Sequence, residues 1–185
     1  GELTWDNTKF TSADMKYEPN RVTAMVSAIE IGAITADKIA FSSSNMKSDI
    51  DFTARIGDFK QNEKGKQTNF PFNSYASSMD EYTWDMDAQT IELNKGPLLS
   101  REKSYFVSTK YEQQGLRFES TKALFDMKLG IIYAENVPHI DVADSRVFPN
   151  KEQLRYAKMQ ICSPCYKVNY WQIEPTSITN YLMHV

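Results

Sequence analysis

The length, composition and charge of this chain exclude several classes of protein. Its 185 residues suffice for one domain with its own hydrophobic core, and 41% hydrophobic and 24% charged residues are ordinary for a globular chain. The formal net charge of -3 is spread along the sequence, so we do not expect a nucleic-acid partner. No apolar run is long enough to span a membrane. We therefore expect residues 1–185 to form a single domain.

The two ends of the sequence predict a piece of a longer protein. Gly1–Phe10 lacks the basic stretch followed by an apolar stretch that is typical of a secretion signal. The other end stops abruptly after Tyr181–Val185, without a polar tail. We therefore expect this chain to be excised from a longer repeat protein.

Alternating apolar and polar residues predict β-strands along the chain. The clearest alternation runs from Ile50 to Ile56, and shorter ones occupy Thr90–Leu93, Leu116–Glu119 and Val168–Ile173. Residues that favour turns, mainly Gly, Pro and Asn, separate these segments. We interpret Asn62–Asn73 as a long polar loop inside the domain. The pattern as a whole is typical of an all-β fold.

Two segments also fit helical spacing. Val22, Met25, Val26 and Ile29 fall on one helical face, and Asn150 could cap a helix over residues 151–161. We favour strands for both, because internal repetition carries more weight than local propensity.

The internal repetition has two parts. Trp84–Leu93 aligns without gaps with Phe125–Ala134 as an aromatic residue, Asp, Met, a turn and an apolar strand, and Tyr17–Ala24 is a looser copy. A second phrase, Ala36–Phe41, corresponds to Ala143–Phe148. Such hairpin units cannot bury their apolar face alone. The sequence therefore predicts antiparallel strands in a roll or sandwich with solenoid-like internal repeats.

Four stretches carry a resemblance to known proteins: Trp84–Asp87, Phe106–Thr109, Leu116–Phe118 and Asn136–Pro149. Together they resemble long, uncharacterised, repeat-containing envelope proteins of Gram-negative bacteria. They are similar, more weakly, to the OstA-like periplasmic domains that shuttle lipopolysaccharide. The first resemblance implies a location in the periplasm or cell envelope, and the second implies a grooved β-roll whose interior accommodates an acyl chain.

These considerations lead to three functional hypotheses. The first is a non-enzymatic structural or binding module of the bacterial cell envelope, whose partners are other repeats of the parent chain or an envelope lipid. The second is a periplasmic lipid or lipopolysaccharide carrier with an apolar groove. The third is a carboxylate- or metal-dependent enzyme. The groove of a carrier would be lined by Ile50, Phe52, Leu116, Phe118, Ile140 and Val142.

Cys162 and Cys165 enclose Ser163-Pro164 and are spaced like a thioredoxin-type redox pair. A redox pair needs its first Cys at a helix N-terminus, whereas Tyr166–Ile173 alternates as a strand. A zinc site would need two further ligands, and His139 and His184 come without a second Cys pair. We therefore predict a disulfide between Cys162 and Cys165, or two inert thiols.

Carboxylates offer two further candidate sites. His139, Asp141 and Asp144 could bind zinc or manganese, but alternation with Ile140 and Val142 leaves His139 and Asp141 on the solvent face. An acidic cluster could bind calcium or catalyse glycoside hydrolysis, but the spacing of its residues suits neither function. Asp85 of this cluster recurs in the repeat as Asp126, which favours a role in a turn. This cluster comprises Asp80, Glu81, Asp85, Asp87 and Glu92.

Aromatic residues are the last group of side chains that could form a binding site. Trp5, Trp84 and Trp171 could line a sugar-stacking platform or a lipid groove, although most aromatic rings of an all-β domain pack in its core. The sequence thus predicts no catalytic residue, no metal ligand and no cofactor.

Overall fold

The computed structural model describes residues 1–34, 38–99, 101–142, 145–149 and 152–157. Within these ranges the regular structure is β-strand, apart from short 3-10 helices at Pro97–Leu99 and Tyr111–Gln113. The all-β, antiparallel fold predicted from the sequence is thereby confirmed, whereas solenoid-like repetition stays a prediction. The strands are β1 (Glu2–Trp5), β2 (Thr8–Ser12), β3 (Lys16–Glu18), β4 (Arg21–Gly32), β5 (Ile39–Asp51), β6 (Ile56–Gln61), β7 (Thr68–Phe70), β8 (Tyr75–Ser77), β9 (Glu81–Asp85), β10 (Thr90–Asn94), β11 (Tyr105–Ser108), β12 (Arg117–Glu119), β13 (Lys122–Asp126), β14 (Ile131–Glu135), β15 (Ile140–Val142), β16 (Ser145–Val147) and β17 (Leu154–Ala157).

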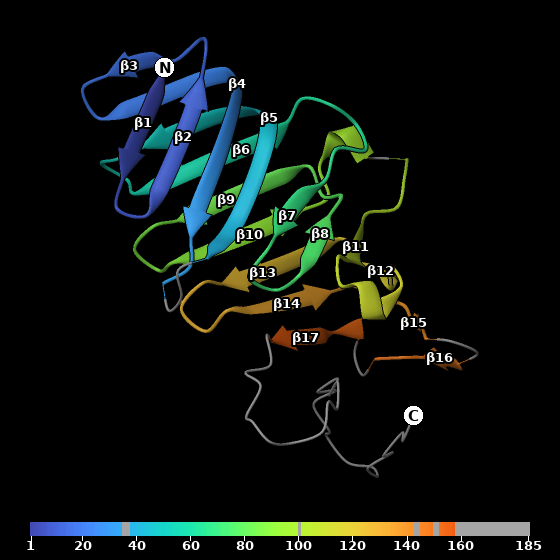
Figure 1. Ribbon diagram of the computed structural model, residues 1–185. Helices are drawn as coiled ribbons and strands as arrows, with labels where there is room; N and C mark the ends of the chain where they lie inside the picture. The colour runs from blue at the N-terminus through green and yellow to red at the C-terminus, as the bar shows by residue number, and fades with distance from the viewer. Residues whose placement is uncertain (35–37, 100, 143–144, 150–151, 158–185) are drawn as a thin grey trace.

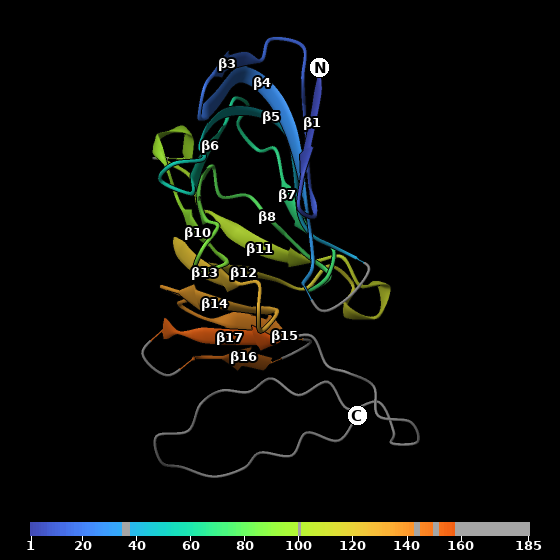
Figure 2. The same cartoon turned by 90° about the vertical axis from the view of Figure 1, so that its left-hand side faces the viewer.

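The strands form two layers that share β5. One layer has the order β1-β2-β4-β5-β6-β9-β10-β13-β14-β17, with every neighbouring pair antiparallel and β3 attached to β4. The other layer, β7-β8-β11-β12-β15-β16, joins the first where Ser42 of β5 pairs with Asn69 of β7. From β5 onward, successive hairpins alternate between the layers, and β3, β4 and β5 curve across the end opposite β16 and β17 (Figures 1 and 2).

Three hairpins of the first layer use the same four-residue turn, each opened by an aspartate. Asp51, Asp85 and Asp126 pair with the first residue of the returning strand, and each side chain accepts a backbone N–H from within the turn at 2.7–2.9 Å. Each turn ends on a residue with φ between 59° and 65°, which is the left-handed region. These closing residues are Arg55, Gln89 and Gly130.

The three turns are joined to one another along a single edge of the sheet. The backbone N–H of Met86 donates to the carbonyl of Arg55, and that of Met127 donates to the carbonyl of Gln89, both at 3.0 Å. Each turn therefore satisfies a polar backbone group of the next one. We call this row of residues 51–56, 85–90 and 126–131 the turn ladder.

The turn ladder corrects one strand prediction and supports another. Ile50–Ile56 is not a strand: it contains the turn between β5 and β6, because the carboxylate of Asp51 binds the N–H groups of Thr53 and Ala54 and Arg55 is left-handed. The alternation of apolar and polar residues that predicted a strand here comes from residues of the turn itself. Trp84–Leu93 and Phe125–Ala134, by contrast, are hairpins as predicted.

Other sequence predictions have mixed outcomes. The segment around Met25 lies in β4, so the strand interpretation is confirmed there, and Leu154–Ala157 is strand rather than helix. Asn62–Asn73 is not entirely loop, because Thr68–Phe70 forms β7. The predicted strand Val168–Ile173 lies outside the described residues.

An aromatic cluster fills the space between the layers. Phe70 of the second layer packs edge-on against Phe41 and Phe125 of the first, with ring centroids 5.6 and 5.4 Å apart, and Phe106 stacks on Phe118 at 5.4 Å. Four of these five rings are completely buried, and Phe118 is 4% exposed. Burial of one such side chain contributes about 1.5–3 kcal/mol. Phe70 thus joins the two layers through its contacts with Phe41 and Phe125, while Phe106 and Phe118 stack within the second layer.

Polar side chains are buried beside the rings and hydrogen-bond to one another, although Oε1 of Gln61 has no partner among the described residues. Gln61 donates through Nε2 to the hydroxyls of Ser43 and Thr68, at 2.8 and 2.9 Å, and those hydroxyls are 2.8 Å apart. The hydroxyl of Tyr82 donates to the carbonyl of Met79, and burial raises the pKa of Tyr82. This network fixes the contact of β5, β6 and β7, because each buried group depends on its partners.

The bulge in β4 depends on one carboxylate. Asp14 accepts hydrogen bonds from the Ser12 hydroxyl at 2.5 Å and from the backbone N–H groups of Met25 and Val26 at 3.0 and 3.4 Å. The bond from Ser12 is the largest of the effects that hold the pKa of Asp14 below its ordinary value. Asp14 therefore satisfies N–H groups that the irregular pairing of β4 with β5 leaves free.

The first prediction concerns Gly130. A Cβ at this position would lie 2.4 Å from the Phe72 ring, whereas a Cβ at Gly65, which also has positive φ, would meet nothing within 4 Å. G65A should lower the free energy of unfolding by the conformational penalty of about 1–2 kcal/mol. G130A should cost clearly more, because the ring must also shift. Urea denaturation measures both, and equal losses would contradict the close approach.

The second prediction concerns pH. Because its pKa is lowered by folding, ionised Asp14 stabilises the fold above the ordinary Asp value of about 4, and this contribution is lost as the pH falls through the folded-state pKa. D14N should therefore melt at a lower temperature than the wild type near pH 7. At about pH 2 the two melting temperatures should converge. A difference that persists in acid would show that the carboxylate charge does not matter.

Candidate functional site

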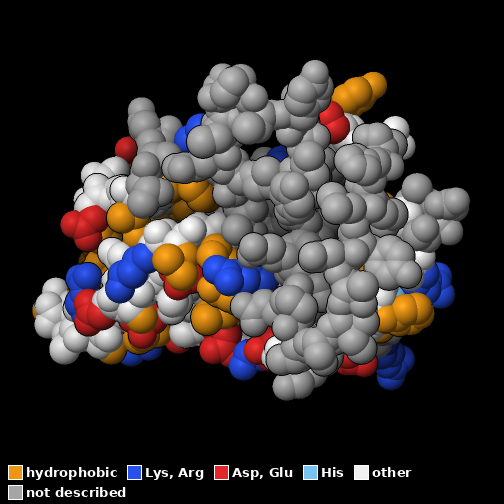
Figure 3. Space-filling view, turned by 90° about the horizontal axis from the view of Figure 1, so that it is seen from below, with side chains coloured by type: hydrophobic (Ala, Val, Ile, Leu, Met, Phe, Trp, Pro, Cys, Tyr) orange, Lys and Arg blue, Asp and Glu red, His pale blue; other side chains and the backbone are white. Residues whose placement is uncertain are grey.

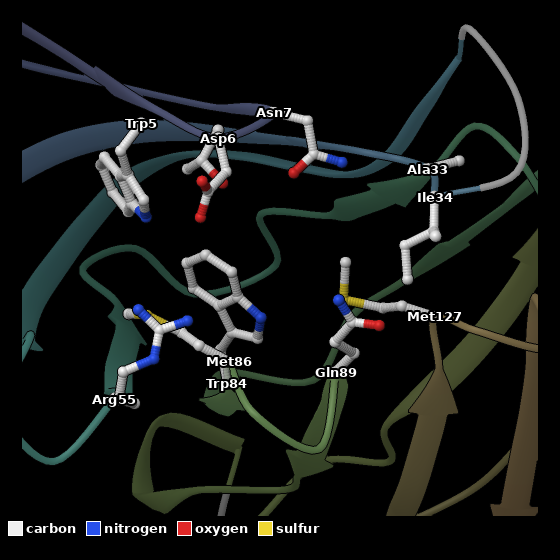
Figure 4. Close-up of a pocket in the computed structure, with 11 residues that line it drawn as sticks. Trp5, Asp6, Asn7, Ala33, Ile34, Arg55, Trp84, Met86, Gln89 and Met127 are labelled. Atoms are coloured by element: carbon white, nitrogen blue, oxygen red, sulfur yellow. The ribbon is translucent and has the colours of Figure 1, made fainter.

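A cavity of about 390 Å³ opens beside the turn ladder. This volume lies within the range of about 300–1,000 Å³ that is usual for small-ligand sites. Four segments surround it: the connection of β1 to β2, the end of β4, the turn ladder and β9 (Figure 4). We call it the turn-edge pocket; it is lined by Trp5, Asp6, Asn7, Thr8, Ala33, Ile34, Arg55, Trp84, Met86, Gln89 and Met127.

Indole rings and thioethers form the apolar wall of the turn-edge pocket. Trp5 lies 6.1 Å from Trp84, centroid to centroid, with the planes tilted by 30°, and it meets the edge of Phe52 at 5.3 Å. Met86 and Met127 occupy the same position in two successive turns, immediately after the turn-opening Asp. The hairpin repeat therefore places two methionines in line on this wall, next to Trp84.

Two buried polar atoms of the pocket have no hydrogen-bond partner among the described residues. They are Nε1 of Trp84 and Oγ1 of Thr8, and the two residues are 6% and 4% exposed. The indole nitrogen of Trp84 points toward the side of the pocket that carries Gln89 (Figure 4). An unpaired buried polar group typically costs about 1–3 kcal/mol. Gln61 Oε1, Asn73 Oδ1 and Asp80 Oδ2, which lie away from the pocket, are also buried without a partner among the described residues.

The remaining polar side chains lie around the pocket. The amides of Asn7 and Gln89 extend toward each other from opposite sides (Figure 4), and Nδ2 of Asn7 donates to the carbonyl of Gly32 at 2.7 Å. Nε of Arg55 donates to Asp87 at 2.8 Å, and this hydrogen bond is the main cause of the raised pKa of Arg55; Asp6 raises it further. Arg55 thus forms an exposed ion pair with Asp87.

The structure separates the six residues predicted to line a groove into two groups. Ile50, Phe118 and Ile140 are at most 4% exposed and belong to the packed core. The other three, Phe52, Leu116 and Val142, are partly buried and pack against it. None of the six lines the turn-edge pocket.

The predicted metal candidates are engaged in ordinary contacts. Asp141 accepts two hydrogen bonds from Arg146, at 2.7 and 3.2 Å, which lower the pKa of Asp141, and His139 Nε2 lies 3.7 Å from the same carboxylate. Ile140 is buried while His139 and Asp141 reach solvent, as the alternation predicted. Asp144 lies outside the described residues. In the described part of the chain, no three His, Cys, Asp or Glu side chains group as a metal site.

The members of the acidic cluster each have a different partner. Asp85 binds the N–H of Ala88, which confirms its turn role, and Asp87 binds Arg55. Glu81 pairs with Lys60 at 2.8 Å, and Glu92 pairs with Lys122 at 3.1 Å. Buried Asp80 accepts the N–H of Gly96 at 2.5 Å.

Several functional predictions lie outside the described residues. These include the proposed disulfide of Cys162 and Cys165, together with His184 and Trp171. Of the aromatic residues singled out in the sequence, Trp5 and Trp84 do meet in a pocket. The polar lining was not predicted, because its members come from segments far apart in the chain; the recurrence of Asp followed by Met was the one signal that pointed to this edge.

Comparisons with models of protein families, with curated proteins and with solved structures find no match to this chain. Among the described residues, no helix combines the length and the apolar character needed to cross a membrane.

The third prediction tests whether the Thr8 hydroxyl is unpaired. Replacing it with a methyl group in T8V removes an unsatisfied polar atom, so the free energy of unfolding should stay the same or rise by about 1 kcal/mol. The matched control is T68V, because Thr68 is equally buried but hydrogen-bonded to Ser43 and Gln61. T68V should lower the stability by about 1–3 kcal/mol. Equal destabilisation of both variants, measured in urea, would contradict the assignment.

Proposed function

We propose that this chain is a non-enzymatic binding module of the bacterial cell envelope and that its ligand occupies the turn-edge pocket. The observation that carries this proposal is a cavity of about 390 Å³ that combines a wall of indole rings and thioethers with the polar side chains of Asp6, Asn7 and Gln89. The envelope location rests on the sequence resemblance alone.

The alternative is a periplasmic carrier that holds a lipid between the two layers. Alternation of hairpins between facing sheets supports it, since this arrangement creates an apolar interior. Completely buried rings such as Phe41, Phe70 and Phe125 occupy that interior, so an acyl chain would have to displace them. At the end that carries β16 and β17, hydrophobic side chains reach the described surface but are interspersed with charged ones (Figure 3). We therefore favour the pocket over the interior.

The fourth prediction tests the binding module. Native mass spectrometry of the protein, after incubation with a small-molecule extract of bacterial envelopes, should detect a bound compound. I34W should abolish the adduct, because Ile34 lines the pocket and is 44% exposed, so a larger ring obstructs it. I39W is the matched control, since Ile39 is also exposed but does not line the pocket. An adduct unaffected by I34W, or none at all, would refute the proposal.

The same experiment addresses the carrier. A lipid held in the interior should raise the melting temperature when lipopolysaccharide is added, and I34W should leave that shift unchanged. Such a result would favour the carrier over the binding module.

A further inference from the structure

The turn-edge pocket carries charges of both signs, and the inference drawn from them rests on the proposed function. Asp6 lines the cavity from the connection between β1 and β2, and Arg55 lines it from the turn ladder. After the larger effect of Asp87, the charge of Asp6 also raises the pKa of Arg55. The two lining charges therefore lie within electrostatic reach of each other.

The guanidinium of Arg55 keeps hydrogen-bond donors for a ligand. Its Nε donates to Asp87, which lies outside the lining of the cavity. Among the described residues, neither of its two Nη groups has a hydrogen-bond partner. Figure 4 shows the guanidinium extending into the cavity beside the indole ring of Trp84. Two parallel N–H donors of a guanidinium match the two oxygens of a carboxylate, so Arg55 can hold a carboxylate of the ligand.

The carboxylate of Asp6 offers the opposite chemistry. It is exposed, and it accepts no hydrogen bond from a residue that the structure describes. Figure 4 shows it pointing into the cavity from the side opposite Arg55. An ammonium group has three donors and no acceptor, so it is the natural partner of this carboxylate.

A ligand with a single charge would satisfy only one of these two side chains. An anion bound to Arg55 would be repelled by Asp6, and a cation bound to Asp6 would be repelled by Arg55. A molecule that carries both an anionic and a cationic group contacts both side chains favourably. The charges of the lining therefore favour a zwitterion.

The remaining lining favours an apolar group on the same molecule. Indole rings of Trp5 and Trp84 and the thioethers of Met86 and Met127 present carbon and sulfur surface next to the charges. A cavity of about 390 Å³ has room for one amino acid. An α-amino acid carries a carboxylate, an ammonium group and a side chain on one carbon atom.

We propose that the turn-edge pocket binds an α-amino acid with an apolar side chain. The carboxylate of the ligand accepts hydrogen bonds from the Nη groups of Arg55, and its ammonium group donates to the carboxylate of Asp6. Its side chain packs on the wall of indole rings and thioethers.

The test is isothermal titration calorimetry of the protein with L-phenylalanine and L-leucine. Each is compared with its analogue without the amino group, 3-phenylpropionate or 4-methylpentanoate, and its analogue without the carboxylate, 2-phenylethylamine or 3-methylbutylamine. At least one amino acid should bind in a saturable manner. Both of its analogues should bind about tenfold more weakly, since each lacks one charge-assisted hydrogen bond. Analogues that bind as tightly as the amino acid would overturn the assignment.

Two variants assign the charges to their residues. D6N should weaken amino-acid binding about tenfold without weakening the analogue that lacks the amino group. R55Q should weaken amino-acid binding equally without weakening the analogue that lacks the carboxylate. Both changes suit the backbone, because Asn tolerates the positive φ of Asp6, and Gln89 occupies the position equivalent to Arg55 in the next turn.

Matched controls remove the same charges elsewhere. Asp58 and Arg117 are exposed and do not line the cavity, so D58N and R117Q should leave the affinity unchanged. A merely structural role of Asp6 and Arg55 would weaken the binding of all ligands alike. That result, or an amino-acid affinity that neither D6N nor R55Q alters, would contradict the assigned contacts.

The outcomes distinguish this inference from the proposed function. O-phosphoethanolamine represents a zwitterion with a phosphate and without an apolar group. If this compound or an extract component binds and I34W removes it, while neither amino acid binds, the pocket is a binding site and the amino-acid assignment is wrong. If the extract and all titrated compounds fail to bind, both proposals fail.

Discussion

The aspartate-opened turn is the interaction on which the architecture depends. A carboxylate that accepts backbone N–H groups closes each hairpin locally, and the left-handed residue at the end of the turn returns the chain in register. Backbone hydrogen bonds from Met86 and Met127 then align successive turns. Since register decides which face each side chain occupies, these turns also direct the aromatic rings into the core.

Both the core and the lining of the turn-edge pocket contain buried polar atoms that lack a partner among the described residues. Between the layers, Nε2 of Gln61 and the hydroxyls of Ser43 and Thr68 hydrogen-bond to one another at normal distances, whereas Oε1 of Gln61 has no partner in the described part of the chain. Beside the turn ladder, Trp84 and Thr8 are just as buried and lack partners among the described residues. The turn-edge pocket therefore differs from the core in its cavity and not in the presence of unpaired atoms.

The turn-edge pocket lies where the regularly repeated hairpin turns meet the connection between β1 and β2. Consecutive turns supply Arg55, Gln89 and the two methionines at equivalent positions, so their alignment follows from the repeat. The connection from β1 to β2 then lies across them and contributes Trp5 and the neighbouring polar residues. Affinity would come from the regular wall and selectivity from this connection, which can vary without disturbing the sheet.

The sequence by itself determined the local features of this protein. Hairpins at Trp84–Leu93 and Phe125–Ala134 could be predicted because strand alternation and turn chemistry act between residues close in the chain. The same logic failed at Ile50–Ile56, where the Asp51 side chain and the left-handed Arg55 make a turn out of an alternating pattern. Only the tertiary structure decided which hairpins face each other and that Thr8, Arg55 and Trp84 share a cavity. Those contacts join positions remote in sequence, and no local rule encodes them.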